Sequence, residues 1–131
     1  MAPAPEPGTA IARCHCGGVE AVAAFPSRFC AHCYCWSCRT THAAGVVTWI
    51  GFKRAQVRFA KGEELLRAYE SSRGTIRRFC TVCGTRFTFE SSHGAWADEV
   101  HLPLALFVTA VDREPAGNSF GKERPDWAPF H

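Results

Sequence analysis

The sequence predicts a mainly β domain, and three observations carry that prediction. Short runs rich in β-branched and aromatic residues recur along the chain, with turn residues between them. No convincing long amphipathic helix separates these runs. Eight cysteines fall into one central cluster and two flanking pairs. We therefore expect metal ions to hold the domain together, with a disulfide framework as the alternative.

Length and composition restrict the class of protein. The 131 residues suit one domain, and 47% hydrophobic and 21% charged residues are ordinary for a globular chain. The formal charge of +3 is small and the basic residues are scattered, which argues against nucleic acid as a partner. No stretch approaches the roughly 20 apolar residues of a membrane span. The N-terminus lacks a secretory signal pattern, so we expect a cytoplasmic monomer or homodimer without a membrane partner.

The predicted elements can be taken in chain order. Residues 1–9 should form a flexible tail, because three prolines and a glycine oppose regular structure there. Residues 10–131 follow as a single zinc-binding β domain. Within it, Pro26 ends the first strand and Gly51 breaks the second, which is apolar enough to be buried on both faces. Strands are predicted over these runs: 19–24, 46–50, 56–59, 76–79 and 85–90.

The second half of the chain centres on a predicted hairpin over residues 76–90. Its tip is a Cys-x-x-Cys turn, and its second strand alternates cleanly between polar and apolar residues. Residues 65–70 fit either a strand or a short helix, since periodicity does not decide between them. Residues 91–99 are expected to be loop. Residues 100–111 are strongly apolar and should cross the core.

The two flanking cysteine pairs are expected to bind one structural zinc ion. Four thiolates give the closed tetrahedral site that is typical of structural zinc. Each pair is followed by a glycine, which permits a tight turn. In the alternative, one pair binds metal and the other is buried as an apolar residue. The four candidate ligands are Cys14, Cys16, Cys80 and Cys83.

The central cluster places four cysteines within nine residues. The pattern Cys33-x-Cys35-x-x-Cys38 gives three ligands, the number that catalytic zinc takes from a protein while one position stays open for water or substrate. Four ligands from nine consecutive residues would strain the loop, so three are favoured. A fourth ligand would close the site, and the candidates for it are Cys30, His32 and His42.

Arg39 directly follows the central cluster. Zinc with three thiolates is already negative, and a substrate thiolate would add to that charge. A neighbouring guanidinium offsets it and can bind a carboxylate through two hydrogen bonds. Arg39 therefore joins Cys33, Cys35 and Cys38 as a candidate catalytic residue, and a solvated loop arginine is the alternative.

These motifs resemble those of the glutathione-dependent formaldehyde-activating enzyme family, which also contains centromere protein V. The resemblance runs from about residue 13 to residue 127. Tyr34 and Asn118 stand where many members have histidine, and Trp36 stands where a small residue is common. The shared motifs are Cys14-x-Cys16-Gly17, Cys33-x-Cys35-x-x-Cys38-Arg39, Arg78-Phe79-Cys80-x-x-Cys83-Gly84 and Arg124-x-x-Trp127.

The resemblance implies an Mss4-like fold of packed antiparallel sheets held together by zinc. It implies two zinc ions per chain, a structural one on the four flanking cysteines and a catalytic one on Cys33, Cys35 and Cys38. The implied reaction adds glutathione to formaldehyde and gives S-hydroxymethylglutathione, a carbon–sulfur lyase reaction run in reverse. The expected partners are therefore a small thiol and a small aldehyde.

Two functions from different classes follow. In the first, an enzyme, the central zinc holds a small thiol as thiolate. The same ion, or a nearby donor such as Tyr34 or His42, polarises the aldehyde. Lys53 and Arg54 join Arg39 as candidate anchors for substrate carboxylates. In the second, the chain is a non-catalytic zinc module that binds a thiol or a partner. A thiol–disulfide oxidoreductase is disfavoured, because no βαβ pattern surrounds the central cysteines.

Overall fold

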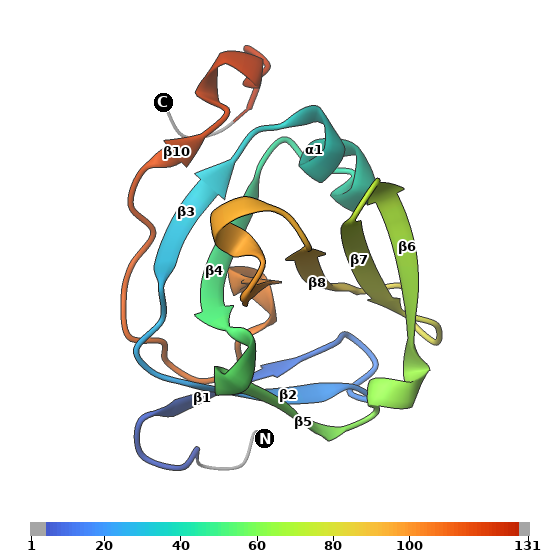
Figure 1. Cartoon of the computed structure of the whole chain (residues 1–131), viewed down its shortest axis with the longest axis vertical. Coiled ribbons are helices and arrows are strands. Elements are labelled where there is room, and N and C mark those ends of the chain that lie inside the picture. Colours follow the sequence, from blue (N-terminus) through green and yellow to red (C-terminus); the bar gives the residue numbers. More distant parts are fainter. Residues whose placement is uncertain (1–4, 129–131) are drawn as a thin grey trace.

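The computed structural model describes residues 5–128, which form two packed β-sheets (Figure 1). The smaller sheet has the strand order β1-β2-β5, and the larger has the order β10-β3-β4-β9-β8-β7-β6. Paired strands are antiparallel, except that β10 runs parallel to β3. The strands are β1 (Thr9–Arg13), β2 (Glu20–Ala24), β3 (Phe29–Cys33), β4 (Val47–Lys53), β5 (Val57–Lys61), β6 (Leu66–Ser72), β7 (Thr75–Cys80), β8 (Arg86–Ser91), β9 (Glu99–Pro103) and β10 (Asn118–Ser119).

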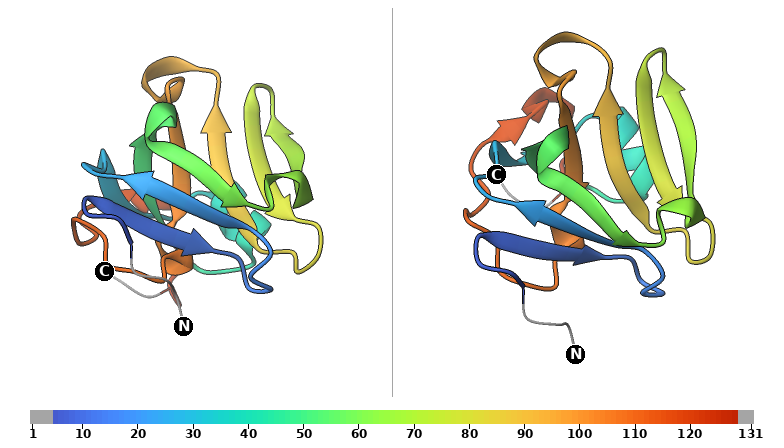
Figure 2. Two further views of the ribbon diagram at one scale, coloured as in Figure 1. Left: turned by 90° about the horizontal axis from the view of Figure 1, so that it is seen from below. Right: turned by 60° about the horizontal axis from the view of Figure 1, so that its bottom comes forward.

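Helical structure within residues 5–128 is limited to α1 (Trp36–His42) and five short 3₁₀ turns. No helix in this part of the chain is long and apolar enough to cross a membrane. Figure 2 shows the three-stranded sheet lying across one end of the larger sheet. The 3₁₀ turns are η1 (Arg54–Gln56), η2 (Glu63–Leu65), η3 (Gly94–Trp96), η4 (Leu104–Leu106) and η5 (Gly121–Glu123).

The two sheets enclose the larger of two apolar clusters. Side chains alternate along β4, so Ile50 and Phe52 face this cluster while Trp49 faces the opposite side of the large sheet. Each large apolar side chain buried in this way contributes about 1.5–3 kcal/mol. The members of the larger cluster are Ala12, Cys14, Val19, Ala21, Ala23, Cys30, Ile50, Phe52, Cys80, Phe87 and Leu102.

Gly51 lies inside β4, and the prediction that it breaks this strand was wrong. The strand runs from Val47 to Lys53, and Gly51 pairs with Phe29 on one side and His101 on the other. A Cβ at Gly51 would lie 2.3 Å from the Phe29 ring. Glycine is needed here because an aromatic ring from the next strand packs directly on the backbone.

A β-bulge in β8 places its two phenylalanines on opposite faces of the sheet. Clean alternation would place Phe87 and Phe89 on one face. The register with β7 shifts between Arg78 and Phe79, which leaves one extra residue in β8. Phe87 therefore packs in the core between the sheets, while Phe89 packs beside Trp49 on the opposite face.

The mainly β prediction is confirmed, and so is the hairpin over residues 76–90. Residues 66–70 belong to a strand, β6, while Leu65 ends the 3₁₀ turn η2. The apolar run 100–111 does not cross the core as one element, because the strand there ends at Pro103 and η4 follows. Residues 91–99, expected to be loop, contain η3. Strands β1 and β3 and helix α1 were not predicted from the sequence.

The predicted N-terminal tail is described only in part. Residues 1–4 lie outside the described residues. Residues 5–8 have no strand or helix, and β1 begins at Thr9. Glu6 nevertheless forms an ion pair with Arg58 of β5, with a nitrogen–oxygen distance of 3.0 Å.

Candidate metal centres

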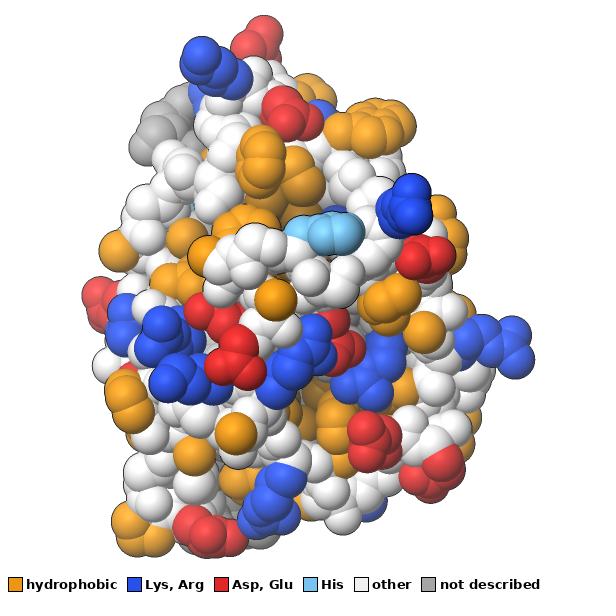
Figure 3. All heavy atoms as spheres, in the orientation of Figure 1, with side chains coloured by type: hydrophobic (Ala, Val, Ile, Leu, Met, Phe, Trp, Pro, Cys, Tyr) orange, Lys and Arg blue, Asp and Glu red, His pale blue; other side chains and the backbone are white. Residues whose placement is uncertain are grey.

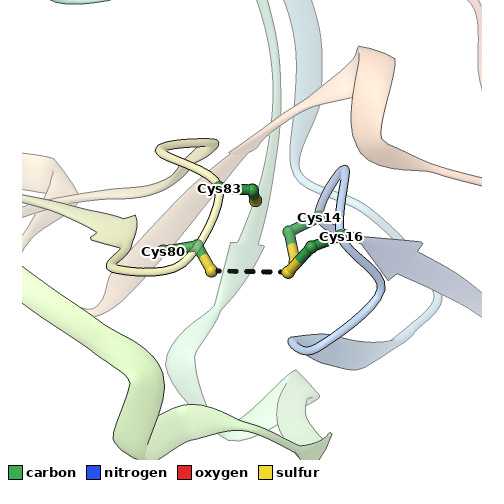
Figure 4. A group of neighbouring side chains, drawn as sticks. All are labelled: Cys14, Cys16, Cys80 and Cys83. Carbon is green, nitrogen blue, oxygen red and sulfur yellow. Dashed lines mark hydrogen bonds between the residues drawn. The ribbon is translucent and has the colours of Figure 1, made fainter.

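The four flanking cysteines converge at one end of the β7–β8 hairpin (Figure 4). Cys14 and Cys16 come from the loop after β1, Cys80 ends β7, and Cys83 lies in the turn before β8. Their four sulfurs all lie within 4.8 Å of one another. The Cys14–Cys16 and Cys16–Cys80 sulfur separations are 3.5 and 3.9 Å. Zinc–sulfur bonds of about 2.3 Å in a tetrahedron give sulfur separations of roughly 3.8 Å, so this outer cluster fits zinc.

Backbone groups around the outer cluster stabilise negative sulfur. The N–H of Gly18 donates to the Cys16 sulfur at 3.4 Å, and the N–H of Val19 donates to the Cys14 sulfur at 3.3 Å. Burial raises the pKa of Cys83, but hydrogen bonds from Thr85, the Cys16 backbone and Cys80 together lower it to about 5. At Cys16 the Gly18 N–H lowers the pKa, but hydrogen bonds with the other three cysteines raise it to about 11. Thiolate is the form that binds metal, so the contacts at Cys14 and Cys83 favour metal binding.

Cys33, Cys35 and Cys38 form a second group, the central trio. Their sulfurs also lie within 4.8 Å of one another, and the Cys33 and Cys38 sulfurs are 3.5 Å apart. Cys33 ends β3, Cys35 is the N-cap of α1, and Cys38 is in its first turn. The sulfur of Cys35 accepts a hydrogen bond from the Cys38 N–H at 3.3 Å, so one contact both caps the helix and orients the ligand set.

The protons of the central trio are shared unequally. Hydrogen bonds from Cys33 and Cys38 lower the pKa of Cys35 to about 2. The hydrogen bonds to Cys35 and Cys38, together with burial, raise the pKa of Cys33. The Cys35 thiolate therefore places negative charge within the trio, and this charge attracts a cation. Three thiolates from one tight turn suit zinc, as four do in the outer cluster.

Within residues 5–128, no fourth His, Cys, Asp or Glu joins the central trio. Cys30 is buried in the core between the sheets, because it occupies the opposite face of β3 from Cys33. His32 Nδ1 lies 2.8 Å from the Thr48 hydroxyl. His42 packs edge-on against Trp49, with ring centroids 5.2 Å apart. All eight cysteines are free, so the disulfide framework is not formed.

Arg77 is the site residue that the sequence analysis missed. It lies on β7, is only 5% exposed, and its guanidinium nitrogens lie 3.7 and 3.8 Å from the Cys38 sulfur. The same group stacks over Phe89, 5.0 Å from the ring centroid, and donates to the Ser71 hydroxyl at 3.0 Å. Its position in β7, three residues before Cys80, was the one available signal.

The other predicted basic and polar residues lie elsewhere. Arg39 donates through Nε to the Tyr34 carbonyl oxygen at 2.8 Å and lies over the Trp36 ring. Tyr34 is fully buried. Arg54 pairs with Glu90. None of Arg39, Tyr34 and Arg54 lines the pocket described next.

A pocket of about 360 Å³ opens beside the central trio. The large sheet forms its floor, and α1, η3 and the segment around β10 form its rim. His101 lies in its wall, and its Nε2 is 3.0 Å from Glu99 Oε1. The lining residues are Phe29, Ala31, Cys33, Cys35, Trp36, Ser37, Cys38, Trp49, Ser71, Ser72, Thr75, Arg77, Phe89, Trp96, His101, Ser119, Phe120 and Glu123.

The surface seen in Figure 3 carries basic and acidic side chains side by side across its middle. The structure also contains ion pairs between arginine and glutamate side chains. Arg78 contacts both Glu63 and Glu90, at 3.4 and 3.0 Å, and Arg28 contacts Glu99 at 3.5 Å. The charges on this face are therefore mixed rather than gathered into a patch of one sign.

Comparison with known proteins places the chain in a family. Its fold is similar to the crystal structure of a Rhodobacter sphaeroides protein, a structural genomics target, with a TM-score of 0.66 at 22% sequence identity. That similarity covers 83% of this chain and 99% of the other. No curated protein matches the chain in sequence. A sequence model described as glutathione-dependent formaldehyde-activating enzyme matches residues 9–123, so the chain belongs to the family of that name.

Proposed function

We propose that the chain is a zinc-dependent enzyme that adds a small thiol to formaldehyde or a similar small aldehyde, the reverse of a carbon–sulfur lyase reaction. A sulfur–carbon bond forms, the carbonyl π bond breaks, and the thiol proton ends on the former carbonyl oxygen. The observation that carries the proposal is the central trio, three sulfurs within 4.8 Å of one another in the wall of a 360 Å³ pocket. Membership of the family supports the same chemistry at the family level.

Cys33, Cys35 and Cys38 would hold the catalytic zinc, and the four cysteines of the outer cluster would hold a structural one. Zinc bound to three thiolates supplies Lewis acidity, which lowers the pKa of a thiol that reaches it. The chain itself contributes a fixed ligand set. The Cys35 cap holds the turn, and the Tyr34 carbonyl fixes Arg39 beside that turn. We assign Arg39 the role of holding this turn in place through its hydrogen bond to the Tyr34 carbonyl oxygen.

Arg77 would provide the charge that the sequence analysis gave to Arg39. Its guanidinium contacts the Cys38 sulfur and is only 5% exposed, so water screens the interaction little. It would therefore offset the negative charge of the trio and of an incoming thiolate. The Ser71 hydroxyl and the Phe89 ring hold the guanidinium in place.

The outer cluster would join distant parts of the chain. Cys16 and Cys80 are 64 residues apart in sequence, so a metal between them closes a long loop. We also propose the Mss4-like assignment for this zinc-linked pair of sheets. The outer cluster does not line the pocket, which suits a structural role.

The test is the rate of the reaction itself. Formaldehyde and a thiol combine without a catalyst, so exchange NMR on ¹³C-labelled formaldehyde should measure the added rate with zinc-loaded protein. We expect wild type to accelerate exchange and Cys35→Ser to abolish the acceleration. Cys30→Ala is the matched control, because Cys30 is a buried thiol outside both clusters. Equal rates with and without wild-type protein would favour the non-catalytic module instead.

A further inference from the structure

The pocket beside the central trio has an aromatic wall. Three of the four tryptophans of the chain line it, together with three phenylalanines. Phe89 lies at the centre, with ring centroids 5.8 Å from Trp49 and 6.2 Å from Trp96. Trp96 also contacts His101 edge-on at 5.3 Å. These rings form a continuous surface that suits another aromatic ring.

Charged groups are scarce in the same lining. Apart from the cysteines and His101, the ionisable residues that line the pocket are Arg77 and Glu123. The donors of Arg77 already serve Ser71, Thr41 and the Cys38 sulfur. One carboxylate oxygen of Glu123 accepts the Trp36 N–H at 2.9 Å. The pocket thus offers no unengaged cation to a carboxylate among its described lining residues.

This lining is a poor match to glutathione. Its two carboxylates are best bound by cations, but the guanidinium of Arg77 already contacts the Cys38 sulfur and Glu123 would repel them. Formaldehyde is too small to use the aromatic wall. The pocket of about 360 Å³ is lined by six tryptophan and phenylalanine side chains. The body of the thiol is therefore the part of the reactants that would fill it.

We propose that the thiol substrate carries an aromatic body and no pair of carboxylates, so that its ring packs against Trp96, Phe89 and Trp49 while its sulfur reaches the central trio. This inference rests on the proposed function and names the substrate class of the same site. In the reaction the S–H bond of the thiol and the carbonyl π bond break, the sulfur bonds the aldehyde carbon, and the proton ends on the former carbonyl oxygen.

Calorimetric titration of the zinc-loaded protein tests the inference without relying on activity. The probes are phenylmethanethiol, glutathione and the sulfur-free phenylmethanol. We expect phenylmethanethiol to bind at least about tenfold more tightly than glutathione, a difference of about 1.4 kcal/mol. Trp96→Ala should weaken both aromatic probes by about tenfold, because Trp96 lies on η3 at the pocket rim and its loss leaves the core intact. Trp127→Ala, at an exposed tryptophan outside the pocket, is the control.

The outcomes separate this inference from the function on which it rests. Glutathione binding as tightly as phenylmethanethiol, or Trp96→Ala leaving both aromatic probes unaffected, would overturn the inference while thiol addition stands. If neither thiol reacts with formaldehyde, the proposed function fails. Binding of phenylmethanol then decides whether the pocket binds an aromatic ring. Binding of phenylmethanol that Trp96→Ala weakens supports the aromatic pocket, and absence of binding overturns it.

Discussion

The guanidinium of Arg77 lies 3.7 Å from the sulfur of Cys38, although the two residues are 39 positions apart in sequence. A buried cation requires a compensating anion or dipole. Within residues 5–128, Arg77 forms no ion pair with a carboxylate. The negative charge beside it is that of the central trio, so the arginine and the cysteines stabilise each other's charged forms.

Replacing Arg77 should weaken metal binding at the central trio selectively. Arg77→Met removes the charge that favours thiolate, and loss of a group that supports metal ligands commonly costs 10–100-fold in affinity, so about that loss is expected. Chelator competition, which reports each bound zinc, measures it. Arg77→Lys keeps a charge but loses the fork of donors and should fall between.

The control for Arg77 is Arg67→Met, at an exposed arginine of β6. It should leave both zinc affinities unchanged. An Arg77→Met protein that is folded and binds two zinc ions as tightly as wild type would contradict the role given to this residue.

Loss of metal from the outer cluster should destabilise the whole fold. A metal between Cys16 and Cys80 closes a 64-residue loop, and a covalent crosslink of that span would be worth about 4 kcal/mol. Cys16→Ser should therefore lower the free energy of unfolding by up to that amount. Cys16 is exposed, so the substitution disturbs little packing.

Denaturant unfolding followed by circular dichroism measures this effect. Chelation should destabilise wild type strongly and Cys16→Ser only slightly, since the variant has already lost its outer metal. Equal destabilisation of the two proteins by the chelator would show that the outer cluster does not carry a structural ion.

The cysteine spacing predicted most of the site, whereas local propensity predicted less of the fold. Both groups of cysteines converge as the pattern indicated. Short turns bring the sulfurs of each motif together, and the fold brings Cys14 and Cys16 to Cys80 and Cys83. Helix α1 escaped notice because its seven residues have no amphipathic repeat. It depends instead on the Cys35 cap and on an αL residue, Ala43, that ends it.

Two further features depend on tertiary packing that a single sequence does not display. The bulge that turns Phe87 and Phe89 to opposite faces is a matter of register between β7 and β8. Arg77 reaches Cys38 only because the large sheet curves to bring β7 close to α1 (Figure 1). Neither is encoded in a local pattern, so both appear only in the folded chain.

A methyl group at Gly51 should disturb the pocket floor. The Cβ of Gly51→Ala would lie 2.3 Å from the Phe29 ring, which must move. Overpacking of this kind costs about 1–3 kcal/mol, so the unfolding midpoint should fall accordingly. Gly121→Ala is the control, because nothing lies within 4 Å of its Cβ position. Equal midpoints for the two variants would contradict the packing of Phe29 on β4.

Stability should decrease in mild acid because of His42. Burial, with the charges of Arg77 and Arg86, lowers the pKa of His42 from 6.5 to about 4. Between these values the unfolded chain binds a proton that the folded chain does not, so the free energy of unfolding falls as pH drops from 6.5 to 4. The loss reaches at most about 3 kcal/mol.

His42→Gln removes this titration. Its free energy of unfolding, measured in denaturant at several pH values, should fall less than that of wild type over the same range. His93→Gln, at an exposed histidine, should follow the wild-type curve. Parallel curves for wild type and His42→Gln would contradict the half-buried, neutral state of His42.

The most direct measurement is the visible absorption of cobalt-substituted protein titrated with 2-mercaptoethanol, a small uncharged thiol. Cobalt in thiolate sites absorbs in a way that reports its sulfur ligands. We expect two ions per chain, and added thiol should change the spectrum of one of them, with no change in Cys35→Ser. A wild-type spectrum with two bound ions that stays constant at saturating thiol would contradict an accessible position at Cys33, Cys35 and Cys38.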